Sequence, residues 1–236
     1  INDKLLESYL VKLDLQPYIT GAAPPKLTLK KLKEIPVPIP KEPKEQQKIA
    51  ACLSSLDELI VAHNEKFQAL KDHKKGLMQN LFPQEGQNVP NYRFPEFEED
   101  EEWVADIIDN VSTLVTDYVA NGSFQSLREN VKAFDHKGYA YYVRLFDLRA
   151  GLGHSEQKFV DENSYNFLRK SSLYGGELLM ANIGANVGEV WQMPSVEFPA
   201  TLAPNMLMIK FKKMSTSDFV FHFLQSGQGQ KNISLA

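Results

Sequence analysis

Side chains able to perform catalysis or to bind a metal are few and widely scattered in this sequence. The five histidines stand at positions 63, 73, 136, 154 and 222, and the single cysteine is Cys52. Metal sites are built from ligands at short, regular spacings, and the spacings here do not fit that pattern. A nucleophile, a base and an orienting group do not stand out either. The sequence therefore predicts no catalytic residue and no metal site.

The composition is that of a globular chain without a general attraction for polyanions. Of its 236 residues, 43% are hydrophobic and 24% are charged, and the formal net charge is −4. This length allows one sizeable core or two small units. Because the net charge is negative, a polyanionic partner must be held by local patches. The lone cysteine and the lack of a signal peptide or a long apolar run predict a cytoplasmic protein without a membrane partner.

A long helix with a heptad seam is the strongest structural signal in the sequence. Between positions 43 and 81, the seam residues recur in alternating steps of four and three. The ten seam positions are Ile49, Leu53, Leu56, Ile60, His63, Phe67, Leu70, Lys74, Leu77 and Leu81. A narrow seam sustained over about four heptads is typical of a coiled coil, whereas a helix packed on a sheet shows a broader apolar stripe. We therefore predict a coiled-coil helix about 60 Å long.

Signals for helix ends flank this stretch. Pro43 suits a first turn, where its missing N–H costs nothing, and Glu45 suits the positive end of the helix dipole. Phe82-Pro83 supplies the stop. His63 and Lys74 interrupt the apolar seam, where polar residues fix register, leave room for a partner, or extend to water.

The rest of the chain divides around this helix. Residues 1–40 form a tail segment, 41–83 the helix, 84–102 an acidic linker and 103–236 a further domain. Proline at every second position from Ile35 to Pro40 forbids a helix and a central strand, so this part is predicted to be extended. The acidic linker is also predicted to stay extended, because like charges repel each other.

The domain that starts at residue 103 is predicted to be α+β, with a mixed sheet and short helices. Its β-like segments are 140–145, 177–181, 189–193 and 207–211. Gly, Pro, Asn or Asp clusters bound each of them, as expected for short strands. Residues 214–224 read as a helix, with Ser217 as a candidate N-cap.

Several of these landmarks resemble the DNA-specificity subunit of type I restriction-modification systems. Ile35 to Pro40, followed by Glu45-Gln46-Gln47-Lys48-Ile49-Ala50, looks like the start of that family's conserved helix, and Lys74 to Phe82 looks like its end. Arg93-Phe94-Pro95-Glu96-Phe97 resembles the lead-in to a target recognition domain. Glu177 to Val190 resembles a strand-loop-strand of that domain. The resemblance touches nearly the whole chain.

This resemblance implies a protein without chemistry of its own. In the family, two target recognition domains are held apart by two conserved helices in an antiparallel coiled coil, and each domain reads half of a split DNA site. Here it implies the tail of one such domain in residues 1–40, one helix, and most of the next domain, incomplete at its C-terminus. The implied partners are double-stranded DNA, the modification subunit, which methylates adenine with S-adenosylmethionine, and the restriction subunit of the full complex. Compared with the full pattern the second helix is absent, so we expect either that a second specificity half or a homodimer supplies it, or that residues 1–40 and the missing continuation of the chain complete the fold.

Candidate DNA contacts follow from residue types in the second domain. Residues 103–236 contain 12 Lys plus Arg against 13 Asp plus Glu, which is not the basic footprint usual for DNA binders. A local patch is therefore required. Asparagine pairs bidentately with adenine, and loops carry recognition, although turn formation also favours asparagine. The candidates are Arg144, Lys158, Arg169, Lys170, Ser171, Asn182 and Asn186.

Two other classes of protein share some of these sequence features. A methyltransferase needs a glycine-rich cofactor loop that leads into a helix, and a motif of the Asn-Pro-Pro-aromatic type. The loop from Gly184 to Gly188 has the wrong spacing and leads into a β-like segment. A coiled-coil adaptor that binds only protein predicts the same helix and the same charge, and only the absence of salt-sensitive DNA binding would distinguish it.

Overall fold

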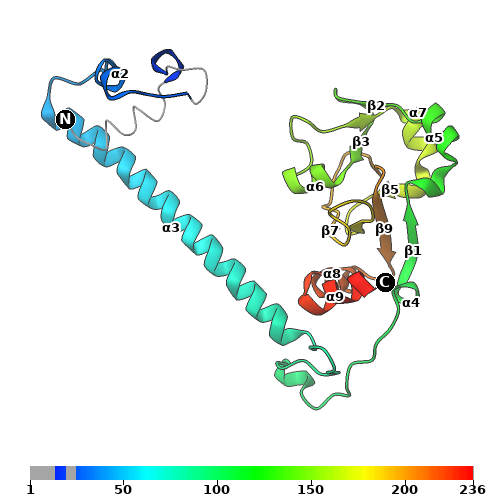
Figure 1. The fold of residues 1–236 in the computed structure, drawn as a ribbon. Coiled ribbons are helices and arrows are strands. Elements are labelled where there is room, and N and C mark those ends of the chain that lie inside the picture. The colour runs from blue at the N-terminus through cyan, green and yellow to red at the C-terminus, as the bar shows by residue number, and fades with distance from the viewer. Residues whose placement is uncertain (1–13, 20–24, 236) are drawn as a thin grey trace. The chain divides into compact units, whose positions relative to one another are not determined.

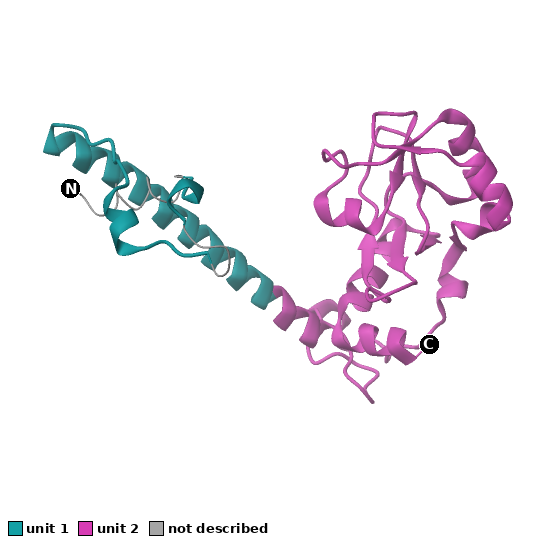
Figure 2. Ribbon diagram, turned by 45° about the horizontal axis from the view of Figure 1, so that its top comes forward, with its two compact units in different colours: residues 1–73 teal, residues 74–236 magenta. Residues whose placement is uncertain are grey.

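The computed structural model describes residues 14–19 and 25–235 of the chain. They fall into two compact units, residues 1–73 and residues 74–236, whose boundary lies within the long helix (Figure 2). Much of the predicted tail segment, at residues 1–13 and 20–24, lies outside the described residues, as does residue 236.

The first unit is dominated by the helix that the heptad pattern predicts. After η1 (Gln16–Tyr18) and α2 (Leu29–Lys33), helix α3 runs without a break over 39 residues, Pro43–Leu81 (Figure 1). The Thr28 hydroxyl caps α2 by accepting a hydrogen bond from the Lys31 amide at 3.3 Å. Residues 35–40 have no regular structure, as their prolines predict. The Gln46 side chain ties this segment to α3 by donating to the Pro40 carbonyl at 2.8 Å.

Most of the seam of α3 faces solvent in the single chain. Ala50 is buried, and Ile49 and Leu53 are half-buried. Beyond them Ile60 is 58% exposed and Phe67 is 59% exposed. Large apolar side chains repeated along one helix face are unfavourable in water, so this seam has the character of an interface.

The helix ends where side chains satisfy its last carbonyls. The Gln84 amide donates to the carbonyls of Gln79 at 2.6 Å and Phe82 at 3.0 Å, and Pro83 cannot continue the helical pattern.

The acidic segment after the helix does not stay extended, contrary to the sequence-based expectation. It contains the short helix η2 (Pro95–Phe97), and the Arg93 guanidinium donates to the carbonyls of Asp100 at 2.7 Å and Glu101 at 3.1 Å. The Trp103 amide closes the loop on the Asn88 carbonyl at 2.9 Å. One central cation that binds backbone oxygens outweighs the repulsion between exposed, well-solvated carboxylates.

Two β-sheets form the second unit. The first sheet is antiparallel, with the order β1 (Ser112–Asp117), β9 (Met206–Phe211), β6 (Leu178–Ala181), β7 (Val190–Gln192). The second has the order β2 (Ala133–Phe134), β4 (Phe159–Val160), β3 (Ala140–Val143), β8 (Ala200–Leu202), β5 (Ser172–Leu173). Only the pairing of β3 with β8 is parallel.

Short helices cover these sheets (Figure 1). They are α4 (Ile108–Val111), η3 (Val119–Asn121), α5 (Phe124–Asn130), α6 (Leu145–Ala150), α7 (Glu162–Phe167), η4 (Arg169–Ser171), α8 (Met214–Gln225) and α9 (Gly227–Leu235). One apolar cluster joins residues of both sheets, including Leu179, Leu202 and Met208. Another joins Leu178 and Ile209 of the first sheet to α8 and α9. Because neighbouring residues on a strand point to opposite faces, β6 and β9 are buried on both sides.

The predicted fold class is confirmed, with one correction and several omissions. The four predicted strands correspond to β3, β6, β7 and β9, and the predicted helix is α8. Ser217 is not the N-cap of α8, which is Lys213. It lies buried in the first turns, where its hydroxyl donates to the Gly176 carbonyl at 2.6 Å. Strand β1 and the shorter strands of the second sheet were not predicted from the sequence.

Two glycines of the β6–β7 loop offer a matched test of how α9 constrains that loop. Gly184 and Gly188 have nearly equal positive φ angles, +85° and +86°, but a Cβ on Gly188 would lie 3.0 Å from Cγ2 of Ile233, whereas one on Gly184 would meet nothing within 4 Å. We expect Gly184→Ala to lower the free energy of unfolding by about 1 kcal/mol through backbone strain. Gly188→Ala should cost about 1–2 kcal/mol more because of overpacking. Equal losses in urea titrations would contradict the packing of α9 on this loop.

Candidate nucleic-acid interface

The loop between β6 and β7 is a tight, exposed turn. The Gly188 amide donates to the Ala181 carbonyl at 2.9 Å, and the Glu189 amide donates to the Asn186 carbonyl at 3.0 Å. Helix α9 holds the base of the loop, because the side-chain amide of Gln230 donates to the Gly188 carbonyl at 3.1 Å. The tip projects side chains from this fixed base, as a recognition loop requires.

Arg149 of α6 holds the side chains of this loop. Its guanidinium donates to Oδ1 of Asn186 at 2.8 Å and forms a bidentate pair with the Glu189 carboxylate, in which the Nε contact measures 2.9 Å. The Trp191 indole donates to the same carboxylate at 2.7 Å. The hydrogen bond from Arg149 lowers the pKa of Glu189, so the carboxylate stays ionised. The amide nitrogen of Asn186 has no hydrogen-bond partner among the described residues.

Arg144, the N-cap residue of α6, is held in place by the buried carboxylate of Asp147. Asp147 is fully buried and accepts from the Arg144 guanidinium at 2.6 and 3.0 Å and from the Arg144 amide at 2.7 Å. The His154 ring lies 2.8 Å from the same carboxylate. Burial alone would raise the pKa of Asp147, but the hydrogen bonds from Arg144 outweigh it and hold the pKa below its ordinary value.

Lys158 lies in the same neighbourhood as Arg144. It forms an ion pair with Asp135, whose pKa it lowers, and the Asp135 charge also acts on Arg144. The structure therefore brings two of the predicted contacts together. Each keeps about a third of its side chain exposed, 31% for Arg144 and 32% for Lys158.

The remaining basic candidates and Ser171 lie on η4. Arg169 and Lys170 are exposed, and the Lys170 amine donates to the Ala120 carbonyl of η3 at 3.0 Å. Ser171 is fully buried, and its hydroxyl accepts from Asn121 at 2.8 Å and donates to the Leu168 carbonyl at 3.1 Å. Its hydrogen-bonding capacity is used inside the protein, so Ser171 offers no exposed group to a ligand.

Asn182 begins the β6–β7 loop beside the turn that precedes β9. Its backbone N–H donates to the backbone carbonyl of Asn205, a residue with a φ of +71°. Its Oδ1 is buried without a hydrogen-bond partner among the described residues. A buried oxygen without a hydrogen bond is unfavourable, so a donor from a ligand or from a rearranged neighbour would stabilise it.

The sequence analysis missed Arg149, Asp147 and Glu189. Arg149 and Glu189 are 40 residues apart, and no spacing rule relates them. A local signal was present for Asp147, because an acid in the first turn of a helix is favoured by the helix dipole, but α6 itself was not predicted.

Two negative findings apply to the described residues, 14–19 and 25–235. No helix among them is long and apolar enough to cross a membrane. No group of three or more His, Cys, Asp or Glu side chains among them is arranged to hold a metal ion.

Comparison with known proteins finds a similarity in the N-terminal part of the chain. A family model for the type I restriction modification DNA specificity domain matches residues 2–72, in agreement with the resemblance found in the sequence. No curated protein matches the chain significantly.

Two solved structures align with 98% of the chain at low similarity. They are the S subunit of the type I restriction-modification system from M. genitalium, at 15% identity and a TM-score of 0.43, and the HsdS subunit from Thermoanaerobacter tengcongensis, at 13% and 0.42. The alignment covers 54% of each of those chains, so this chain spans about half their length.

Asp147 and Asp135 form a matched pair for testing which ion pair stabilises the fold. We expect Asp147→Asn to lower the free energy of unfolding by about 2–4 kcal/mol, because Arg144 and His154 lose a buried ionised partner. Asp135→Asn should cost much less, because Asp135 is exposed and its pair is screened by solvent. Chemical denaturation measures both values, and similar losses would contradict the assignment.

The same carboxylate predicts a pH dependence of stability. Since the pKa of folded Asp147 lies below its unfolded value, the stabilisation is fully present above the unfolded pKa of about 3.9. It is lost as the pH falls through the folded value. Asp147→Asn should therefore flatten the acid limb of the stability profile, and an unchanged limb would count against the buried pair.

Proposed function

We propose that this chain is part of the sequence-specific DNA recognition subunit of a type I restriction-modification enzyme. The observation that carries the proposal is a 39-residue helix with an exposed heptad seam, which begins within the region that matches the specificity-domain family. In this proposal the unit formed by residues 74–236 reads half of a divided DNA site. Helix α3 seats the modification subunit and spaces the reading unit from its counterpart.

Chemistry is assigned to the partners and not to this chain. The modification subunit binds S-adenosylmethionine and methylates adenine, and the restriction subunit joins it in the full complex. The described residues offer positioned hydrogen-bond donors and cations on α6 and the β6–β7 loop, which suit binding more than catalysis.

The geometry of Asn186 refines how a base would be read. A bidentate contact to adenine needs both the acceptor and the donor of the asparagine amide. In the free protein Arg149 donates to this acceptor, which keeps a second lone pair, and the amide donor is also presented. The Arg149 hydrogen bond therefore orients the Asn186 amide and leaves it one acceptor site and its donor for adenine.

Replacing Asn186 tests whether the loop reads sequence. We expect Asn186→Ala to reduce discrimination between preferred and altered sites by about 5- to 150-fold, the loss of about 1–3 kcal/mol typical of a bidentate contact. Non-specific affinity should change little. The matched control is Asn166→Ala, which removes an exposed asparagine from α7. Selection from randomised duplexes, with and without the modification subunit, measures the preference, and an unchanged preference removes Asn186 from the interface.

Salt dependence separates a DNA reader from an adaptor that binds only protein. DNA affinity should fall linearly with the logarithm of salt concentration, with a slope of about −0.9 per neutralised phosphate. The absence of binding at every salt concentration, with the modification subunit present, would overturn the proposal.

Acidic substitutions in the seam test assembly. Leu56→Asp with Ile60→Asp should abolish association with a partner helix, because unpaired charges would be buried in the interface. The matched control is Val61→Asp with Ala69→Asp, which adds the same charge to exposed positions outside the seam. Sedimentation measures assembly, and normal assembly of the seam variant would show that the heptad register is wrong.

A further inference from the structure

The guanidinium of Arg149 is shared between a carboxylate and an amide of the β6–β7 loop. Its Nε donates to Oε1 of Glu189 at 2.9 Å, and its Nη2 donates to Oε2 of the same carboxylate. The same Nη2 also donates to Oδ1 of Asn186 at 2.8 Å. One cation on α6 therefore links the residue proposed to read a base to an acid at the end of the same loop.

The chemistry of arginine decides which end of the Asn186 amide is held. A guanidinium has donors and no acceptor, so it can hold an amide only through the oxygen. The Nδ2 group is left as the free end of the side chain. The backbone at the same residue is also fixed, because the Asn186 carbonyl accepts from the Glu189 amide at 3.0 Å. A bidentate contact with adenine requires an amide whose orientation is set in this way.

Glu189 holds Arg149 in place for this purpose. Its side chain is 29% exposed, and its Oε1 also accepts from the Trp191 indole at 2.7 Å, so its position does not depend on Arg149 alone. The carboxylate stays ionised, because the hydrogen bond from Arg149 lowers its pKa. A bidentate pair of arginine with a carboxylate is among the strongest contacts between side chains.

A DNA phosphate would compete with Glu189 for the same guanidinium. Arginine is a frequent phosphate ligand in protein–DNA complexes, and phosphate contacts carry no sequence information. Arg149 keeps 44% of its side chain exposed, so a phosphate could reach it. The partner that wins this competition decides whether Arg149 contributes to sequence preference or to general affinity.

The loop itself does not depend on these side chains. The Gly188 amide donates to the Ala181 carbonyl at 2.9 Å, and the Gln230 side chain donates to the Gly188 carbonyl at 3.1 Å. These bonds remain when Arg149 or Glu189 is replaced. The network therefore orients a side chain on a turn that is already formed.

We propose that Arg149 and Glu189 are positioning residues that determine specificity: Glu189 keeps the guanidinium from DNA phosphates, so that Arg149 stays on Asn186 and sets its amide for adenine. The proposal rests on the function proposed above, in which Asn186 contacts a base. It deepens that function by assigning the residues that fix the contact. Arg149, although a cation, then contributes to the choice of base and not to the salt-dependent part of DNA affinity.

Glu189→Gln tests the competition with phosphate. The variant keeps an oxygen for the Trp191 indole but loses the charge and one of the two acceptors that hold Arg149. We expect the slope of log affinity against log salt concentration to steepen by about 0.9, because the released guanidinium neutralises one more phosphate. The preference for adenine should fall about 2- to 12-fold, the cost of ordering one side chain on binding.

Both quantities are measured by fluorescence anisotropy on the full chain with the modification subunit present. The base position examined is the one whose preference Asn186→Ala removes. The matched control is Glu197→Gln, which removes an exposed carboxylate from the segment between β7 and β8 and should change neither quantity.

Arg149→Met separates the orienting role from the effect of charge. Methionine is a flexible side chain without a donor, so the preference for adenine should fall by the same 2- to 12-fold as in Glu189→Gln. The double variant Arg149→Met, Glu189→Gln should show the same loss of preference with the salt slope of the unaltered protein. A steeper slope in Glu189→Gln that disappears in the double variant is a result that a purely structural role of the pair would not produce.

The remaining outcomes separate this proposal from the function on which it rests. An unchanged slope in Glu189→Gln, or a slope that stays steep in the double variant, would overturn the competition with phosphate. An unchanged preference in Arg149→Met, while Asn186→Ala still removes it, would overturn the orienting role and leave the contact by Asn186 standing. Failure of the unaltered chain to bind DNA would instead overturn the proposed function.

Discussion

The pairing of β6 with β9 is the constraint on which the second unit depends. Both strands are buried on their two faces, so each contributes to two apolar clusters at once. Leu179 and Met208 join the first sheet to the second, while Leu178 and Ile209 carry α8 and α9. A shift of one residue in this pairing would exchange the two faces and disrupt both clusters. The position of the β6–β7 loop and that of α8 follow from the same register.

Arginine side chains of the second unit donate hydrogen bonds to backbone, amide and carboxylate oxygens and thereby hold nearby segments in place. Arg93 folds the acidic loop, Arg144 satisfies the buried Asp147, and Arg149 holds the β6–β7 loop. Arginine suits each of these roles because its planar group donates several hydrogen bonds in a fixed geometry. A chain with a net charge of −4 can therefore present ordered cations locally while remaining acidic as a whole.

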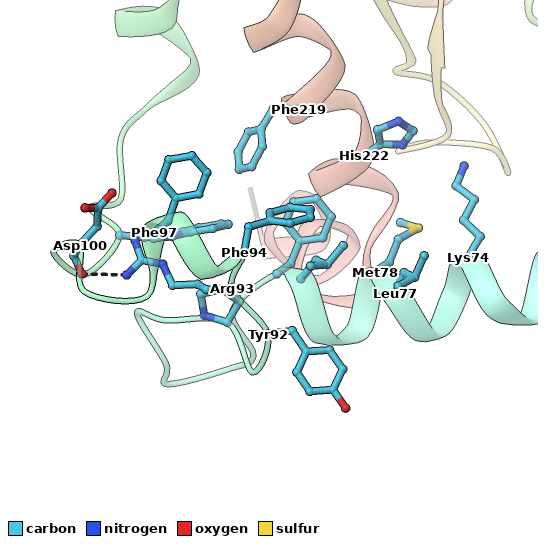
Figure 3. A pocket seen from close by; sticks show the side chains of 14 residues that line it. Lys74, Leu77, Met78, Tyr92, Arg93, Phe94, Phe97, Asp100, Phe219 and His222 are labelled. Atoms are coloured by element: carbon cyan, nitrogen blue, oxygen red, sulfur yellow. Dashed lines mark hydrogen bonds between the residues drawn. The ribbon is translucent and has the colours of Figure 1, made fainter.

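Helix α3 connects this framework to the proposed assembly. Its seam is exposed in the single chain, and its last positions line an aromatic pocket of about 450 Å³ beside α8 (Figure 3). The helix therefore offers exposed apolar side chains along its seam. Such a surface is consistent with a chain whose proposed function requires partners at both the helix and the reading unit.

The sequence by itself determined the elements whose signals are local. The heptad spacing and Pro43 were sufficient to predict α3, and the short apolar segments between turn residues were sufficient for β3, β6, β7 and β9. Periodicity and terminating residues act within a few positions, so they can be read from the chain alone. The same reading placed Asn186 in an exposed loop, as the structure shows.

Only the tertiary structure decided which polar side chains are available and which are used internally. Ser171 and Ser217 look like exposed polar residues in the sequence, but both are buried and bonded to backbone carbonyls. The hold of Arg149 on Asn186 joins residues 37 positions apart, and the aromatic pocket joins α3 to α8. Such contacts depend on how strands and helices pack, because burial and pairing are properties of the folded chain and not of any one segment.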